Sequence, residues 1–327
     1  MSFVTSVIPV YNGARFLPQT LEMFAGQTRR PDRLVVLDNC STDATPEIAR
    51  GFKGMPCEWR RNETNIGLLG NLNRALAFSS ETEYLHILPV DDRIKPNFFE
   101  QMLPLLEDAR GLALAYSLVE KIDGDGVVIE PARTRRRGAR VVPKREYLGA
   151  LAELITILMP GIIMKTGCQP APVQFLLDMP QVGDCLFYAR FGAHCSKLVE
   201  ESEPLCQHRR HAASTTDRNI LNLDAWVRDE WRNMTMVMEL IEEGPFEHWL
   251  RWQKLKCLFA ARSRIKIDMV VGSRPDYARE IRMATLENVS KVHWRLGNAA
   301  VWMRDLLHGK TRPHFTDQSE GPGNPKK

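Results

Sequence analysis

Two adjacent carboxylates, Asp91 and Asp92, follow a short apolar run and are the side chains best suited to chemistry in this chain. The run, residues 83–90, is typical of a strand buried on both faces of a parallel sheet. In open α/β sheets, ligands bind outside the carboxyl ends of such strands. Neighbouring carboxylates repel each other unless a cation separates them from an anion, and paired oxygen ligands suit Mg²⁺ or Mn²⁺. The pair therefore predicts a divalent-metal site that also holds substrate phosphates; the alternative is a solvated turn.

Two earlier strand-like runs also end in polar side chains. Tyr11 and Asn12 follow the run of residues 3–10, and Asp38 and Asn39 follow residues 34–37. Because the carboxyl ends of parallel strands meet at one edge of a sheet, these side chains and the Asp pair predict a shared ligand site. The first strand is not followed by Gly-x-Gly-x-x-Gly, and the sequence has no Gly-x-x-x-x-Gly-Lys-Ser/Thr loop. A dinucleotide-dependent dehydrogenase and a phosphate-loop NTPase are therefore disfavoured.

Alternating strand and helix patterns must position these residues. The four strands expected first are residues 3–12, 34–37, 57–61 and 83–90, and the helices between and after them are residues 14–27, 44–52, 69–78 and 97–107. This alternation is the signature of βαβ units and a parallel sheet. A strand at 112–119, a hairpin turn at 123–126 and a helix at 147–158 follow. The turn lacks the ligand spacing of a calcium-binding EF-hand.

Composition limits the class of protein. The 327 residues are 44% apolar and 26% charged with a net charge of +4, which is typical of a soluble globular protein and does not suggest a nucleic-acid binder. Seven cysteines, an odd number without a Cys-x-x-Cys pair, favour reduced thiols in a cytoplasm. We expect no signal peptide, and the longest apolar stretch, residues 149–164, is too short and interrupted to span a bilayer.

Five arginines lie between residues 133 and 140. Such a charge run is usually a solvated loop. The alternative is that it gathers an anionic acceptor, for example a lipid diphosphate at a membrane surface.

Four short motifs together resemble glycosyltransferase family 2, a group of inverting, metal-dependent sugar transferases with the A-type fold. They are Ser-Val-Ile-Pro-Val-Tyr-Asn at 6–12, Leu-Asp-Asn-Cys-Ser-Thr-Asp at 37–43, Asn-Ile-Gly at 65–67 and Val-Asp-Asp at 90–92. The resemblance covers roughly residues 2–215 and is strong over the first hundred. It implies an α/β, Rossmann-like nucleotide-diphospho-sugar transferase sheet with helices on both faces.

The resemblance also implies a donor site. Pro9, Tyr11 and Asn12 would line the base and ribose, and Asp38 would accept hydrogen bonds from either. The remaining donor-site residues that it implies are Asn65 and Asn73 near the diphosphate or sugar, Asp91 at the ribose, and Asp92 at the metal, Mn²⁺ or Mg²⁺. This chain departs from the common pattern at Asn39, where many members have a second acid, and at Pro89, where many have a first Asp.

Asp184 precedes an amphipathic helical pattern, and its simplest role is to cap that helix. In the family, an acid at the start of this helix is the general base that takes the proton of the acceptor hydroxyl. Arg209, His211 and Ser214 resemble the family's Arg-x-His-x-x-Ser segment. Arg209 and His211 would neutralise the leaving diphosphate, or His211 would be a further metal ligand. The alternative is a basic solvated turn.

The pattern changes after residue 216. Residues 223–243, 246–264, 276–288 and 292–308 all predict helices, and six of the seven tryptophans lie among them. We expect a catalytic domain over residues 1–215, a helical region over 216–310 and a disordered tail over 311–327. The helices would pack on the catalytic domain, on another subunit in a homo-oligomer, or on a membrane surface.

The combined interpretation is an inverting glycosyltransferase of bacterial surface polysaccharide or glycolipid synthesis. Its donor would be a nucleotide sugar and its acceptor a saccharide or a lipid-linked saccharide, with a location in the cytoplasm or at the inner face of the cell membrane. Two alternatives are a sugar-phosphate nucleotidyltransferase, which usually begins with a glycine-rich basic loop, and a non-catalytic scaffold that binds nucleotide sugars.

Overall fold

The computed structural model describes residues 3–132, 134, 136–155, 157–210 and 219–307. The chain divides into two compact units, one up to Glu243 and one from Gly244 onward. Each unit is described by itself below. The first is an α/β unit built on one mixed sheet, and the second is helical.

The N-terminal part of the sheet is parallel, as the alternating pattern predicts. Its strands are β1 (Val4–Val10), β2 (Arg33–Asp38), β3 (Glu58–Arg61) and β4 (Tyr84–Ile87), in the order β3-β2-β1-β4. The connecting helices are α1 (Leu17–Ala25), α2 (Thr45–Gly51) and α3 (Gly67–Leu76), the last followed by the 3₁₀ helix η1 (Ala77–Glu81). Strands β1, β2 and β4 are short runs rich in β-branched, aromatic or leucine side chains, which explains why they form where they were expected, whereas β3 is mostly charged and exposed.

The rest of the sheet is mixed. The order continues β4-β9-β6-β10-β5, with β9 (Ile162–Lys165) antiparallel to both β4 and β6 (Ala113–Ile122). Strand β10 (Lys197–Arg209) runs parallel to β6 and antiparallel to β5 (Arg93–Ile94) and β8 (Ala139–Val141), and β7 (Val128–Glu130) pairs with β6. The parallel sheet therefore ends at β4. Strand β9 directly follows the 3₁₀ turn η3 (Met159–Gly161). Because β9 is antiparallel to its neighbours, it needs no crossover helix of the kind that joins parallel strands.

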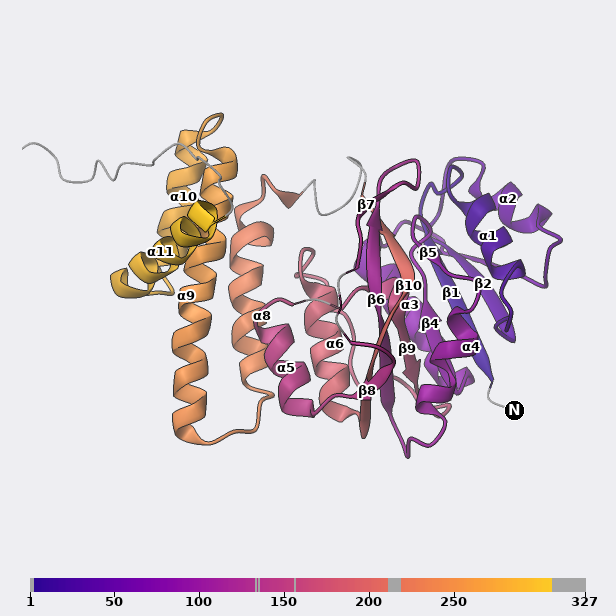
Figure 1. The fold of residues 1–327 in the computed structure, drawn as a ribbon. Coiled ribbons are helices and arrows are strands. Elements are labelled where there is room, and N and C mark those ends of the chain that lie inside the picture. Colours follow the sequence, from indigo (N-terminus) through magenta and orange to yellow (C-terminus); the bar gives the residue numbers. More distant parts are fainter. Residues whose placement is uncertain (1–2, 133, 135, 156, 211–218, 308–327) are drawn as a thin grey trace, which may run out of the picture. The chain divides into compact units, whose positions relative to one another are not determined.

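Helices cover both faces of the sheet, as expected. Side chains of α1, α2 and α4 (Phe98–Met102) form one apolar core with β1 and β2, and the 3₁₀ helix η2 (Pro104–Leu106) follows α4. Helices α5 (Lys144–Ala152), α6 (Gly183–His194) and α8 (Asp229–Met238) contact one another and lie together beside the central strands (Figure 1). A π-helical turn, η4 (Asp224–Arg228), leads into α8.

Several elements differ from the sequence prediction, among them helix α5 and strand β10. Helix α5 ends at Ala152 and not at residue 158, because Leu154 adopts a left-handed backbone with φ of 58°. Strand β10 was not expected. Its interior contains Glu200, Glu201 and Pro204, which hide the strand pattern, and the pairing with β6 shifts register around Pro204.

The second unit contains α9 (Pro245–Val270), α10 (Pro275–Leu286) and α11 (Lys291–Leu307), close to the helices expected there. Helices α10 and α11 both pack on α9. Gly297 lies at the α9–α11 crossing, where an added Cβ atom would come within 2.7 Å of backbone atoms of Cys257 and Ala261. Among the described residues of the chain, no helix has both the length and the apolar character needed to cross a bilayer.

Candidate active site

The predicted acid pair lies in the turn between β4 and β5. Asp92 is 2% exposed, and its Oδ1 accepts hydrogen bonds from the backbone N–H of Arg209 at 2.9 Å and from Nδ1 of His208 at 3.0 Å. The antiparallel pairing of β5 with β10 brings these residues together across 116 positions of sequence. Asp91 is partly buried beside it. The end of β10 therefore holds the acid pair in place.

Burial and the neighbouring imidazole shift the pKa of Asp92 in opposite directions. Burial raises the pKa of the Asp92 carboxyl, although the His208 contact opposes this. Burial acts to lower the pKa of His208, but the Asp92 carboxylate outweighs it and the pKa of His208 is raised. A carboxylate that is costly to ionise in a buried site gains from a nearby cation.

Asp184 lies in the first turn of α6 (Gly183–His194). It is the second residue of α6, and its Oδ1 accepts the backbone N–H of Cys185 at 2.8 Å. The N-cap position is held by Val182, so Asp184 is not the capping residue that its simplest role required. Burial raises the pKa of Asp184, and the backbone N–H of Cys185 and the charge of His208 act to lower it.

The loop after β1 is locked to the loop after β2. Asn12 has a left-handed backbone with φ of 51°; its N–H donates to Ser41 Oγ at 2.9 Å, and its Oδ1 accepts the N–H of Thr42 at 2.8 Å. Tyr11, beside it, is 48% exposed, whereas Pro9 is buried inside β1. The Tyr11 ring is therefore accessible from solvent, Asn12 shapes the loop, and Pro9 is part of the buried strand.

Asp38 and Asn65 are both held by the protein. Asp38 is fully buried; Oδ1 accepts the N–H of Ser41 at 2.8 Å, and Oδ2 contacts Arg61 Nη1 at 3.2 Å. Asn65 Oδ1 accepts hydrogen bonds from Asn39 Nδ2 at 2.8 Å and from the N–H of Gly67 at 2.9 Å. Asn39, which replaces an acid common in the family, thus orders the loop before α3.

Two other expected residues are engaged in structural contacts. Both ends of the Asn73 amide bond the backbone of Phe175, with Nδ2 to the carbonyl at 2.9 Å and Oδ1 to the N–H at 2.8 Å. The buried Arg209 guanidinium donates to the carbonyls of Asp91 at 2.8 Å and Asp123 at 2.9 Å. Asn73 therefore anchors the segment before α6, and Arg209 ties the hairpin to the acid pair.

Few side chains are available as ligands for a metal ion. The described part of the chain has no group of three His, Cys, Asp or Glu residues placed to hold a metal ion. His211 and Ser214 lie outside the described residues. One or two carboxylates with substrate phosphates are nevertheless the usual ligands of Mg²⁺, so Asp91 and Asp92 fit such an ion chemically.

The functional residue that the sequence did not single out is His208. It lies three positions before His211 and is the imidazole that contacts Asp92. Its position at the end of β10 could have indicated it, but the polar composition of β10 prevents that strand from being recognised in the sequence.

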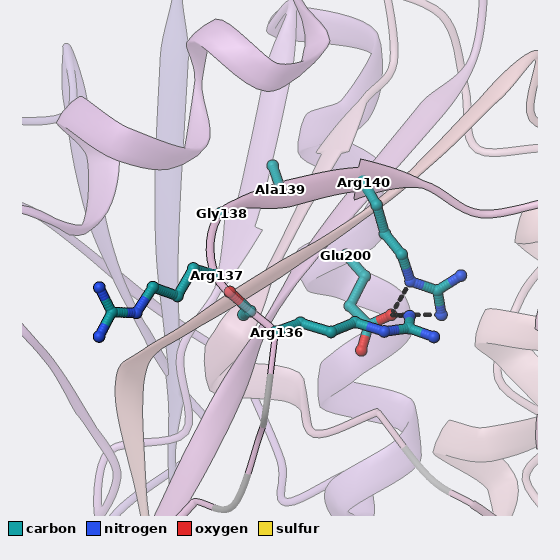
Figure 2. Close-up of a pocket in the computed structure, with 7 residues that line it drawn as sticks. Arg136, Arg137, Gly138, Ala139, Arg140 and Glu200 are labelled. Carbon is teal, nitrogen blue, oxygen red and sulfur yellow. Dashed lines mark hydrogen bonds and ion pairs between the residues drawn. The ribbon is translucent and has the colours of Figure 1, made fainter.

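Two hollows lie along β6 and β10. One, about 250 Å³, is lined by Arg136, Arg137, Arg140 and Glu200, among others (Figure 2). The other, about 380 Å³, extends from Tyr116 to Lys121 and has mostly apolar walls from α5 and the segment that follows it. Lys121, at one end of the larger hollow, is paired with His208 across β6 and β10, but neither Asp92 nor Asp184 lines the hollow.

Comparisons with known proteins agree with this geometry. Residues 5–160 match the model of glycosyl transferase family 2. The chain is 24% identical to the uncharacterized glycosyltransferase RP339 of Rickettsia prowazekii, over 70% of each protein. The fold is similar to that of S. aureus TarS 1–349 in complex with UDP-GlcNAc, with a TM-score of 0.59, 15% identity and coverage of 99% of this chain and 98% of that one.

The mannosyltransferase PcManGT from Pyrobaculum calidifontis, in complex with GDP-Man and Mn²⁺, has a TM-score of 0.54 at 14% identity, covering 94% of this chain and 88% of that one. These two structures share the fold, with helices on both faces of a mixed sheet. The sequence match over residues 5–160, which includes the acid pair and both loops at the strand ends, shows that this part of the chain is similar to glycosyltransferase family 2.

Proposed function

We propose that this protein is an inverting glycosyltransferase that moves a sugar from a nucleotide-diphosphate sugar to an acceptor hydroxyl, in bacterial surface polysaccharide or glycolipid synthesis. The observation that carries the proposal is a pair of acids on separate elements: Asp92, buried beside His208 after β4, and Asp184, in the first turn of α6, on both of which burial raises the pKa. A single displacement at a sugar carbon needs charge stabilisation for the leaving diphosphate and a base for the acceptor hydroxyl. The two acids are separated in sequence and suited to these two tasks.

The donor side is formed by the ends of β1, β2 and β4. Tyr11 offers an exposed ring for the base, and the Asn12–Ser41 lock holds the loop in a single conformation before the donor arrives. Asp91 and Asp92 would hold a Mn²⁺ or Mg²⁺ ion, which when bound supplies positive charge to the diphosphate. The Mn²⁺ in the PcManGT complex supports this choice of ion.

The acceptor side is Asp184. The acceptor oxygen attacks the anomeric carbon from the face opposite the diphosphate, the bond from that carbon to the diphosphate oxygen breaks, and the acceptor proton passes to an Asp184 Oδ. Burial raises the pKa of Asp184, which makes its carboxylate a stronger base than an exposed one. His208 contacts the Asp92 carboxylate at 3.0 Å and orients it.

The test is slow hydrolysis of the donor in the absence of acceptor. We expect one of a panel of UDP-, GDP- and dTDP-sugars to release its nucleoside diphosphate in the presence of Mn²⁺. Asp92→Ala should reduce that release by about 100-fold or more, because a metal contributes several kcal/mol of charge stabilisation. Asp125→Ala, on the exposed hairpin, is the matched control and should leave it unchanged. Hydrolysis at the wild-type rate in a folded Asp92→Ala protein would remove the metal role.

We further propose a cytoplasmic location, because all seven cysteines are free. Homo-oligomer or membrane contact through α9–α11 remains a proposal that rests on their tryptophans and exposed apolar side chains, such as Trp249 and Trp302.

A further inference from the structure

Hydrogen bonds join four asparagine side chains beside the end of β2, in the order Asn65, Asn39, Asn62 and Asn71. Asn39 directly follows β2, and its backbone N–H donates to the carbonyl of Val10, the last residue of β1, at 2.8 Å. Asn39, Asn62 and Asn71 are buried, whereas Asn65 is exposed. The chain of amides therefore leads from the interior to the surface beside the strand ends that form the proposed donor site.

Backbone groups fix the direction of the buried amides. The Leu37 carbonyl can only accept, so Asn71 directs Nδ2 to it at 3.1 Å and Oδ1 to Asn62. Asn62 Nδ2 donates twice, to Asn71 Oδ1 at 2.9 Å and to Asn39 Oδ1 at 2.8 Å. Among the described residues, Asn62 Oδ1 is left buried without a partner. The oxygens on either side of Asn62 therefore decide its orientation.

Asn39 uses its whole hydrogen-bonding capacity. Its Oδ1 accepts from Asn62 and from the backbone N–H of Ile66 at 3.0 Å. Its Nδ2 donates to Asn65 Oδ1 at 2.8 Å and to the Gly67 carbonyl at 3.2 Å. A carboxylate at this position, which many members of glycosyltransferase family 2 have, offers no N–H and would face two oxygens. The neutral amide therefore suits this turn, and an ionised acid would release it.

The exposed end of the chain presents a hydrogen-bond donor. Asn65 Oδ1 accepts from Asn39 and from the N–H of Gly67 at 2.9 Å, so the oxygen is turned inward. Asn65 Nδ2 is then directed outward, and within the described part of the chain no group accepts a hydrogen bond from it. The network thus sets which end of the Asn65 amide meets a ligand.

The turn that begins at Asn65 leads toward the proposed base. Helix α3 begins at Gly67, and a Cβ atom added to Gly183 would lie 3.7 Å from Leu69 Cδ2. The first turn of α3 therefore contacts the first turn of α6, which contains Asp184. In the proposed reaction, the transferred sugar lies between the nucleotide at the strand ends and the base that activates the acceptor.

We propose that Asn39 is a positioning residue for the donor sugar. Its amide holds the turn and keeps Asn65 Nδ2 directed outward, where that group donates a hydrogen bond to an oxygen of the sugar. The assignment rests on the proposed function, because it requires a nucleotide-sugar donor. Since the turn is ordered before the donor arrives, binding does not have to order it.

The ratio of two affinities isolates the sugar contact. Full-length protein with Mn²⁺ is titrated with the nucleotide sugar that it hydrolyses fastest and with the matching nucleoside diphosphate. Asn65→Asp keeps the inward oxygen and replaces the outward donor by an acceptor, so it should melt like wild type. It should weaken the nucleotide sugar relative to the diphosphate by about threefold to tenfold. Its new charge acts on the diphosphate of both ligands and therefore cancels in the ratio.

Asn39 variants test the positioning role. Asn39→Asp should change the ratio in the same direction as Asn65→Asp. Burial should raise the pKa of the introduced carboxyl, so between about pH 8 and about pH 5.5 its protonated form returns one donor and part of the ratio. Asn39→Leu, of similar shape but without a polar group, should show no recovery. Asn222→Asp is the matched control, because the Asn222 oxygen only accepts from the N–H groups of Asp224 and Ala225 and an acid retains that function.

Two results overturn the inference. One is a wild-type ratio in Asn65→Asp. The other is an Asn39→Asp protein that melts at a lower temperature with its ratio unchanged, since Asn39 would then be structural only. If Asn39→Asp does not fold, Asn39→Ser, which keeps one donor, is held to the same criterion with a smaller expected change.

Donor hydrolysis separates this inference from the proposed function. Hydrolysis that requires Asp92, together with a ratio that Asn65→Asp leaves unchanged, defeats the positioning role alone. A ratio that follows Asn39 and Asn65, in a protein that hydrolyses no nucleotide sugar, defeats the proposed function and leaves a protein that binds nucleotide sugars. Failure to bind any nucleotide sugar defeats both.

Discussion

His86 should make the first unit less stable as the pH falls below neutrality. The side chain is fully buried on β4, between Ser6 and Pro160, with Phe98 and Phe99 around it at centroid distances of 5.0 and 5.3 Å. Nε2 lies 3.1 Å from the Pro160 carbonyl oxygen, which can only accept, so Nε2 carries the proton. Nδ1, 2.8 Å from Ser6 Oγ, then accepts from the hydroxyl. The native imidazole is therefore neutral.

The size of the effect follows from the pKa. Burial lowers the pKa of His86 to about 4 from 6.5. The folded state therefore binds fewer protons than the unfolded state, and stability is lost as the pH falls through the unfolded value toward the folded one. Between pH 8 and pH 5, this single group should reduce the free energy of unfolding by about 2 kcal/mol.

Equilibrium urea unfolding at pH 8 and pH 5 measures the loss. Other groups titrate too, so the informative quantity is the difference in pH dependence between wild type and His86→Gln, which has no titrating ring. The variant should be less stable at pH 8 but lose about 2 kcal/mol less on acidification. His194→Gln, at an exposed position, is the matched control and should follow wild type. Equal losses in wild type and His86→Gln, or an imidazole that titrates near pH 6.5 by NMR, would refute the reasoning.

Three further predictions concern single positions. Asp184→Asn should lower transfer by about 10²- to 10⁴-fold in an acceptor assay while the Kd for nucleotide sugar stays within about twofold; weaker donor binding would indicate a structural role instead. Asn73→Ala should cost about 1–3 kcal/mol in urea unfolding because the Phe175 backbone loses both partners, with donor KM unchanged; a raised KM would restore Asn73 to the donor site. Gly297→Ala should destabilise the helical unit by about 1–3 kcal/mol by forcing α9 and α11 apart, whereas Gly272→Ala, which meets nothing within 4 Å, should not; equal thermal melts for the two would contradict the close crossing.

The parallel strands and the acid pair could be predicted from the sequence because each is encoded locally. Apolar runs fix β1, β2 and β4, and Asp91 and Asp92 directly follow the last of them. The partners of Asp92 could not be predicted, because the contact with His208 depends on the pairing of a two-residue strand with a polar one. Periodicity carries no information on such a register.

The same limit explains the asparagines. A motif shows that Asn65 and Asn73 are present, but not what their amides bond. In the folded protein, the Asn65 side chain accepts hydrogen bonds from Asn39 and Gly67, and both ends of the Asn73 amide bond the backbone of Phe175. Two residues of the same type therefore order two different segments, the loop before α3 and the segment before α6. Residues whose roles depend on distant backbone groups are the ones that a family pattern transfers least reliably.

The central position of β9 has a consequence for how the protein is made. The region that matches the family ends at residue 160, two residues before β9 begins, and β9 is the strand that joins β4 to β6. A nascent chain that has only reached that point holds the four-stranded sheet β3-β2-β1-β4 and the separate β6–β7 pair, with the edge of β4 uncovered and no strand to join the two. Ribosomal synthesis must therefore deliver residues 162–165 before the two halves of the sheet can unite, and a shortened gene that stops at the family boundary would encode an aggregation-prone fragment.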